Sequence, residues 1–294
     1  MKGRIHDTMM AMKHRSYAFG IVLAAVAAIA VVVGAFLYLK KEPAHPSIDE
    51  ATYAEIQTVT ASSPQLAPAA SRIRIPILAY HIVRPSYPSD SAAVRALALT
   101  PETFDAELAH LHSAGYHVIG FRDLEAYFAS STPLPSQPVI LSFDDGWGDQ
   151  YEYAFPILRK YGDTATFFVF TNAIDHGKFL TWTDLRTMLA AGMTVGDHSR
   201  SHPFLARITA TSTLWGEIDG SKKLLEQELG TPVTEFAYPF GQYDPAIISL
   251  VKQAGFKSAR GDYWDGGEVG RNRLYTLPAL NAPTTTEAFD RMFP

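Results

Sequence analysis

Two adjacent carboxylates give the first chemical signal in the sequence. Asp144 and Asp145 stand in Ser142–Gly146, directly after the apolar run Val139–Leu141. Neighbouring side chains at a strand end point in different directions, so one carboxylate can bind a metal ion while the other faces a water molecule. An Asp-Gly pair is also common in ordinary turns, and that alternative stays open for this pair taken alone.

Two histidines spaced four residues apart give the second signal. His198 and His202 lie on one side of a helical turn, near enough to bind one ion, while Pro203 favours a shaped loop. A pair of partly exposed surface histidines is the alternative. With one aspartate they form a nitrogen and oxygen ligand set that leaves a position open on zinc or a similar ion. Such an ion lowers the pKa of its water towards about 7, and the second aspartate is then available as a general base.

Two further apolar runs end in polar or turn-forming residues. Pro239 and Gly241 fix a turn after Phe236–Tyr238, where a backbone N–H can help to bind an oxyanion. His81 ends the run Pro76–Tyr80, and beside a metal site its imidazole is a candidate general acid. A buried aromatic strand end and a structural histidine are the respective alternatives.

The composition excludes several classes of protein. Since the chain of 294 residues has no cysteine, it has no disulfides, iron–sulfur clusters, thiolate zinc sites or cysteine nucleophile. A net charge of −5 argues against a general nucleic-acid binder, and 47% apolar residues exclude a wholly disordered chain. No Gly-x-Ser-x-Gly elbow occurs, which disfavours a serine hydrolase.

The N-terminal part differs in character from the rest. Residues 17–39 carry no charge, and as a helix they span about 34 Å against a hydrocarbon core of about 30 Å. The basic residues on the N-terminal side place that end in the cytoplasm. We expect a cytoplasmic N-terminus at 1–16, a transmembrane anchor at 17–39, a Pro/Ala/Ser-rich linker at 40–72 and a catalytic domain at 73–294. A cleaved signal peptide and a buried core helix are the alternatives for the anchor.

The net charge differs in sign between the N-terminal part and the rest of the chain. Residues 1–41 carry six Lys and Arg and one Asp, a net charge of +5, and the remainder carries 19 basic and 29 acidic residues, a net charge of −10. A domain this acidic should avoid anionic polymers and tolerate neutral or cationic ones.

Short apolar runs alternate with amphipathic segments from residue 72 onward. This order predicts parallel βα units, in a barrel or an open sheet. The predicted strands are Ile75–Val83, His117–Phe121, Val139–Phe143, Ala165–Phe170, Thr194–Asp197 and Glu235–Tyr238. One predicted helix begins at Thr100-Pro101. The other predicted helices are Pro156–Tyr161, Trp182–Ala191, Leu214–Leu229 and Pro245–Ala254.

Residues 73–294 resemble the polysaccharide deacetylase (NodB homology) domain, carbohydrate esterase family 4. Ser142–Gly146 matches the first motif, usually Thr-Phe-Asp-Asp-Gly, and His198–His202 matches the second. The resemblance implies an α/β fold, a distorted (β/α) barrel of about seven strands. It also implies Asp144 as the general base, and Asp145, His198 and His202 as metal ligands. Tyr238-Pro239 matches part of the third motif, whose tyrosine backbone N–H helps to form the oxyanion hole.

The sequence departs from the family pattern at two places. No arginine closely precedes Phe236 to brace the catalytic aspartate, and Arg271 or Arg273 is a candidate replacement. The segment Leu277–Leu280 lacks the usual histidine of the last motif. The early His81 resembles the branch that contains poly-N-acetylglucosamine deacetylases, in which an N-terminal histidine serves as the acid.

The expected activity is a metal-dependent removal of N-acetyl groups from N-acetylglucosamine units of an extracytoplasmic polysaccharide, exopolysaccharide or peptidoglycan. The catalytic residues are Asp144, His81 and Tyr238, and the cofactor is a divalent metal, zinc or alternatively cobalt, nickel, manganese or iron. The partners are the acetylated polysaccharide and the membrane, with no nucleic acid. An O-acetyl polysaccharide esterase and a catalytically silent glycan-binding module stay open as alternatives.

Overall fold

The computed structural model describes residues 73–130, 132–263 and 265–294. All of the described residues belong to one compact unit. The predicted cytoplasmic N-terminus, transmembrane anchor and linker lie outside the described residues. Among the residues that are described, no helix combines the length and the apolar character needed to cross a membrane.

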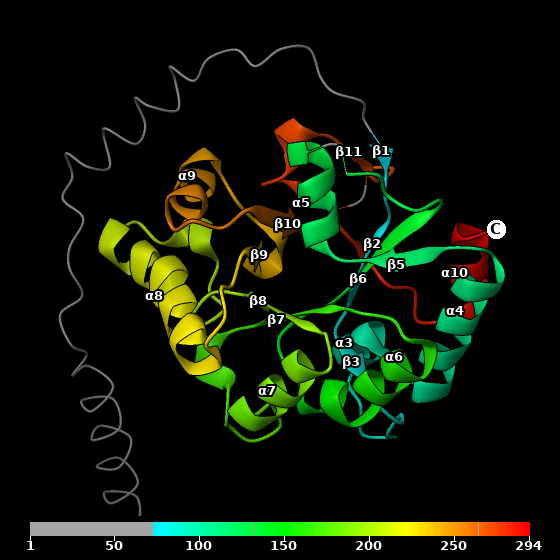
Figure 1. Cartoon of the computed structure of the whole chain (residues 1–294). Coiled ribbons are helices and arrows are strands. Elements are labelled where there is room, and N and C mark those ends of the chain that lie inside the picture. Colours follow the sequence, from blue (N-terminus) through cyan, green and yellow to red (C-terminus); the bar gives the residue numbers. More distant parts are fainter. Residues whose placement is uncertain (1–72, 131, 264) are drawn as a thin grey trace, which may run out of the picture. The chain divides into compact units, whose positions relative to one another are not determined.

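A parallel β-sheet curls into a nearly closed barrel (Figure 1). Eight strands form its path in the order β12 (Leu277–Pro278), β10 (Ser258–Gly261), β9 (Glu235–Ala237), β8 (Thr194–Asp197), β7 (Thr166–Val169), β6 (Pro138–Phe143), β2 (Ile77–Tyr80) and β13 (Leu280–Asn281). A ninth strand, β5 (His117–Ile119), pairs with β6. Only Ala279 separates β12 from β13, so this short segment joins the two edges of the sheet.

This barrel resolves the choice between barrel and open sheet, and it has eight strands in the path instead of the expected seven or so. The strand predicted at Ile75–Val83 is interrupted at His81, and its last residues form β3 (Ile82–Val83) in a separate small sheet. Strand β10 was not predicted, because Ser258–Gly261 has no apolar run.

Helices lie around the barrel (Figure 1). They are α4 (Pro101–Ser113), α5 (Phe121–Ser130), α6 (Phe155–Tyr161), α7 (Trp182–Ala190), α8 (Thr211–Leu229), α9 (Pro245–Gln253) and α10 (Thr286–Met292). The shorter helical turns are η1 (Gln150–Ala154), η2 (Thr171–Ala173), η3 (Leu205–Arg207), η4 (Pro239–Gly241) and η5 (Arg271–Arg273). The predicted start of α4 is confirmed, since the Thr100 hydroxyl accepts a hydrogen bond from the Thr103 N–H at 3.2 Å.

Successive side chains of a strand point to opposite faces of the sheet, so the apolar core consists of two clusters. Ile77 and Ala79 of β2 pack in one apolar cluster with Ile140 and Phe168, inside the barrel, and residues of α5 join this cluster. Leu78 and other alternate residues face the surrounding helices in a larger cluster. This period of two decides which side chains of each strand point into the barrel.

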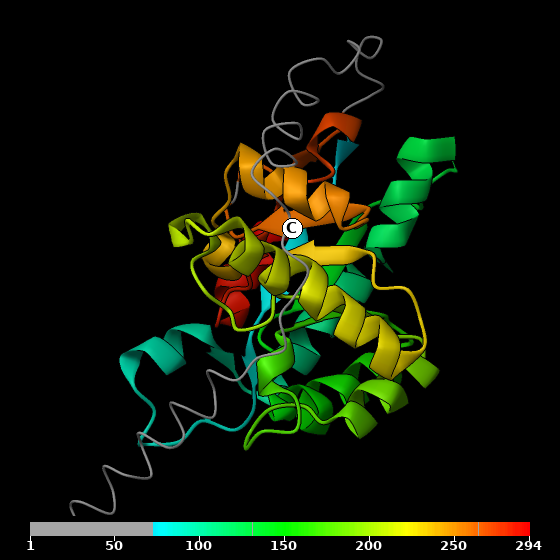
Figure 2. The same cartoon turned by 90° about the vertical axis from the view of Figure 1, so that its left-hand side faces the viewer.

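A short arm extends from the end of β2. It consists of β3, helix α3 (Ala92–Leu97) and β4 (Ala98–Leu99), which pairs with β3. In Figure 2 the arm projects to the lower left, away from the barrel. A separate antiparallel pair joins β1 (Ile73–Arg74) to β11 (Glu268–Val269).

Candidate active site

The predicted site residues follow the carboxyl ends of parallel strands. His81 follows β2, the two aspartates follow β6, and His198 follows β8. Because these strands are parallel, their carboxyl ends meet at one end of the barrel, where barrel enzymes carry their chemistry. The structure therefore brings together residues that are more than 100 positions apart in the chain.

Asp145, His198 and His202 form a compact group whose ligand atoms all lie within 4.8 Å of one another. Oδ1 of Asp145 is 3.4 Å from Nε2 of His202 and 3.8 Å from Nε2 of His198, and the two imidazole nitrogens are 3.1 Å apart. Two imidazoles and one carboxylate leave room for further ligands on a zinc-like ion. The donor set thus fits a divalent metal.

Hydrogen bonds behind the group orient two of its members. Nδ1 of His198 lies 2.7 Å from the carbonyl oxygen of Ala237 and donates to it, which leaves Nε2 as the lone-pair nitrogen. The indole N–H of Trp147 donates to Oδ2 of Asp145 at 3.0 Å, leaving Oδ1 towards the histidines. Burial, together with the nearby His202, lowers the pKa of His198 to about 3, so this imidazole is neutral, the form that binds metals.

The two loops that carry the ligand group have an unusual backbone. Asp145, Ser199 and His202 all have positive φ, at 69°, 69° and 56°, a region that non-glycine residues rarely occupy. Glu217 of α8 holds the loop, because its carboxylate accepts hydrogen bonds from the N–H and the hydroxyl of Ser201 at 2.8 and 2.7 Å. Such conformations persist only where surrounding contacts impose them, as α8 does for the loop that carries the histidines.

Asp144 is buried beneath this group and is braced by Arg260. The guanidinium of Arg260 donates through Nη2 to Oδ1 of Asp144 and through Nη1 to Oδ1 of Asp262 at 2.7 Å. Arg260 is fully buried and lies over the Phe168 ring, 4.8 Å from its centroid. The aspartate is therefore fixed by a residue of β10.

The second oxygen of Asp144 faces the site. Oδ2 is buried and has no hydrogen-bond partner among the described residues, and Nε2 of His81 lies 3.8 Å from it. A buried carboxylate oxygen normally has a partner, so this one is placed to accept a proton from a bound molecule. The side chain of His81 is 13% exposed, whereas that of Asp144 is 1% exposed.

The structure does not support the predicted role of Tyr238. Its backbone N–H donates to the carbonyl oxygen of Arg260 at 3.0 Å, so it is not free for an oxyanion. Its side chain is buried, and the hydroxyl donates to the carbonyl of Tyr275 at 3.1 Å. Tyr238 directly follows β9, which pairs in parallel with β10. Its N–H therefore takes part in the hydrogen bonding between these two strands.

The sequence reasoning missed Arg260 and wrongly offered Arg271 and Arg273 as the brace. Arg273 instead contacts Asp265 at 2.6 Å and the hydroxyl of Tyr263 at 3.0 Å. Arg260 stands next to Ala259, which packs with the outer cluster, so alternation turns Arg260 inward. One arginine inside Ser258–Gly261 was the available signal, but it is visible only once that segment is recognised as a strand.

Comparisons with known proteins agree with this geometry. Residues 131–259 match the family model described as polysaccharide deacetylase, a range that contains Asp144, Asp145, His198 and His202. The chain is 27% identical over 184 residues to the Bacillus subtilis protein YxkH, covering 63% of each chain. It is 24% identical over 182 residues to a poly-beta-1,6-N-acetyl-D-glucosamine N-deacetylase of Staphylococcus aureus, covering 58% of this chain and 62% of that one.

A solved structure shares the fold. The Streptococcus pyogenes deacetylase PplD superposes with a TM-score of 0.69 at 24% identity, covering 76% of this chain and 100% of that one. The present chain spans less than two thirds of the length of the two curated relatives, 63% and 62%.

Proposed function

We propose that this chain, which matches the polysaccharide deacetylase family over residues 131–259, removes N-acetyl groups from N-acetylglucosamine units of an extracytoplasmic polysaccharide in a metal-dependent reaction. The observation that carries the proposal is the buried Asp144. Arg260 holds one of its oxygens, and the other has no hydrogen-bond partner among the described residues and lies beside the ligand group of Asp145, His198 and His202. Structural carboxylates are normally satisfied on both oxygens.

Asp145, His198 and His202 are the residues that would hold the metal. A divalent ion bound there supplies Lewis acidity, which activates water and polarises an amide carbonyl. Oδ2 of Asp144 accepts the proton of the attacking water, whose oxygen forms a bond to the carbonyl carbon of the acetamide. Arg260 keeps the carboxylate in place during this transfer.

His81 completes the reaction as the general acid. Its Nε2, 3.8 Å from Asp144, donates a proton to the sugar nitrogen as the carbon–nitrogen bond breaks, so that a free amine and acetate leave. The two proton-transferring groups thus lie side by side. This placement suits an amine leaving group, which must be protonated to depart.

The choice of N-acetylglucosamine polymers rests on the similarity to the staphylococcal enzyme together with His81. The chain also has a candidate anchor at residues 17–39, and we place the catalytic domain on the extracytoplasmic side of the membrane on the basis of that segment and its basic flank. Protease treatment of intact cells tests this placement: the domain should be digested from outside, and full protection until lysis would contradict it.

Acetate release by the purified full-length chain tests the activity. The substrates are β-1,6- and β-1,4-linked N-acetylglucosamine oligomers, peptidoglycan and acetyl-xylan, each with and without a chelator. We expect release from glucosamine-based substrates that stops on chelation and returns with divalent metal. Release from acetyl-xylan alone would assign an O-acetyl esterase. Glycan binding without release from any substrate would assign a silent binding module, and chelator-insensitive release would contradict the metal dependence.

A further inference from the structure

A buried glutamine side chain links the two residues that carry the proposed proton transfers. The carboxamide of Gln150 donates through Nε2 to the carbonyl oxygen of His81 at 2.7 Å and to that of Asp144 at 2.6 Å. Gln150 is fully buried, and both acceptors are carbonyl oxygens, so the atom between them must be the amide nitrogen. One side chain therefore bonds to the backbone of the candidate general acid and to that of the candidate general base.

These two hydrogen bonds lie where two neighbouring strands separate. Strands β2 and β6 pair in parallel up to Tyr80 and Phe143, and the N–H of Asp144 still donates to the carbonyl oxygen of Tyr80 at 2.8 Å. After His81 the chain enters β3, which pairs with β4 of the arm instead. Beyond the last bond of the ladder, the Gln150 side chain therefore connects the separating strands at the catalytic residues.

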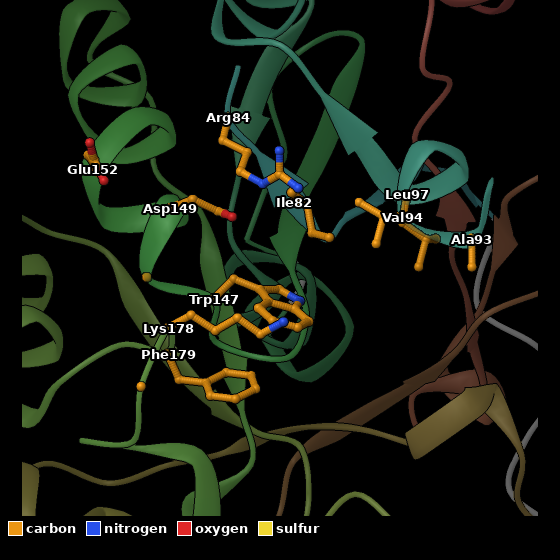
Figure 3. A pocket seen from close by; sticks show the side chains of 12 residues that line it. Ile82, Arg84, Ala93, Val94, Leu97, Trp147, Asp149, Glu152, Lys178 and Phe179 are labelled. Atoms are coloured by element: carbon orange, nitrogen blue, oxygen red, sulfur yellow. The ribbon is translucent and has the colours of Figure 1, made fainter. Parts of the chain in front are cut away.

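The segment that carries Gln150 also holds the chain after His81. Asp149, the preceding residue, accepts a hydrogen bond at Oδ1 from the N–H of Val83 at 3.3 Å. Figure 3 shows the cavity beside this segment, and in it the Asp149 carboxylate points towards Ile82. Gln150 begins η1, a π-helical turn that leads into α6, and such turns are rare and occur frequently at functional sites. Two consecutive residues thus hold the backbone at and after His81.

The relative position of the acid and the base is what these contacts control. Nε2 of His81 lies 3.8 Å from Oδ2 of Asp144, and in the proposed reaction the two groups exchange protons with one acetamide and its attacking water. Arg260 fixes the Asp144 carboxylate directly, whereas Gln150 fixes the backbone from which the His81 imidazole extends. A misplacement of about 1 Å at reacting groups can lower a rate by roughly 100-fold.

We propose that Gln150 is a positioning residue, whose carboxamide sets the distance between the proton donor and the proton acceptor by joining the two strand ends that carry them. The proposal rests on the proposed function and deepens it. Because Gln150 is fully buried, it contacts neither substrate nor metal in this role. Its loss should therefore lower kcat and leave KM and metal binding as they are.

Kinetics of acetate release by the full-length Gln150→Met chain test this role, since methionine keeps a long unbranched side chain but cannot donate to the two carbonyls. On the N-acetylglucosamine pentamer that the wild type deacetylates fastest, we expect kcat to fall about 100-fold and KM to change less than about twofold. Bound zinc should stay at the wild-type level. Tyr275→Phe is the control, because it also removes a side-chain hydrogen bond to a carbonyl oxygen, that of Phe256 at 2.9 Å, just before β10. It should leave kcat and KM unchanged.

A second variant, Gln150→Asn, keeps the carboxamide on a side chain that is one methylene shorter. It should bond to one carbonyl oxygen at most, and its kcat should lie between those of the wild type and Gln150→Met. A wild-type kcat in Gln150→Met would overturn the proposal, as would a fall in activity that appears in KM alone or follows a loss of zinc. If circular dichroism shows that neither variant folds, Gln150 has a structural role only and the proposal is also overturned.

Crystal structures of the wild type and Gln150→Met separate a failure of this role from a failure of the proposed function. If the wild type releases no acetate from any substrate, the proposed function is rejected, and the separation between Nε2 of His81 and Oδ2 of Asp144 decides the positioning role. A longer separation in Gln150→Met supports that role. An unchanged separation in Gln150→Met overturns it.

Discussion

Replacing Arg260 with methionine should destabilise the protein strongly. The guanidinium is fully buried and bonds two carboxylates, those of Asp144 and Asp262. Removing one partner of a buried pair leaves an uncompensated charge and typically costs about 3–5 kcal/mol. We therefore expect the free energy of unfolding to fall by about 3–5 kcal/mol in Arg260→Met. Arg260→Lys keeps the charge but loses the planar guanidinium that reaches both carboxylates. Its free energy of unfolding should lie between those of the wild type and Arg260→Met.

Urea denaturation of the full-length chain measures this cost, and a double-mutant cycle identifies its origin. In Asp144→Asn the buried charge is absent, so Arg260→Met should cost less in that background, with an interaction energy of about 1–3 kcal/mol. Arg273→Met, a solvent-side arginine paired with Asp265, is the control and should change stability by about 1 kcal/mol or less. Strictly additive effects of the Arg260 and Asp144 substitutions would refute the bracing contact.

Three further results are expected. Burial raises the pKa of Glu107 to about 8 from its ordinary 4.5, so the folded protein retains a proton that the unfolded chain loses. The free energy of unfolding should therefore fall as pH rises from about 4.5 to 8, by up to about 1.4 kcal/mol per pH unit. In urea titrations at several pH values, Glu107→Gln should show a flatter pH dependence than the wild type. Equal pH dependence in the two proteins would contradict this role of Glu107. Trp147→Phe removes the indole hydrogen bond to the ligand carboxylate and should weaken metal binding about 10- to 100-fold in competition with a chelating dye, and unchanged affinity would exclude this orienting role. Gly196→Ala would place a Cβ 2.4 Å from the Phe168 ring and should lower the melting temperature. A Cβ at Gly216 on α8 would meet no described atom within 4 Å beyond the helix's own backbone and its chain neighbours, so Gly216→Ala should leave the melting temperature unchanged or raise it. Equal melting temperatures of the two glycine variants would refute the packing argument.

Strong apolar runs and paired motifs made much of the site predictable. The run Val139–Leu141 identified β6, and in a parallel fold the end of such a strand is where Asp144 and Asp145 must lie. The spacing of His198 and His202 placed two imidazoles on one side of a turn, and the structure brings both to Asp145. These features depend on local pattern, which a sequence displays directly.

The bracing contact was not predictable in the same way. Arg260 reaches Asp144 across 116 positions of the chain, from a strand whose one apolar side chain is Ala259 and which is held by pairing with β9 and β12. The oxyanion role of Tyr238 failed for a related reason, since its N–H is taken up by that same neighbouring strand. The Arg260 contact and the hydrogen bond of the Tyr238 N–H both depend on pairing between strands, and no local sequence pattern indicates that pairing.

Metal content of matched aspartate variants tests the central claim most directly. The wild-type chain, Asp145→Asn and Asp144→Asn are purified at full length, loaded with zinc, desalted and analysed for bound metal by atomic emission. We predict that Asp145→Asn loses the metal, whereas Asp144→Asn binds it as the wild type does and yet releases no acetate. If Asp145→Asn retains the metal, or Asp144→Asn loses it, the division of labour between the two carboxylates is contradicted.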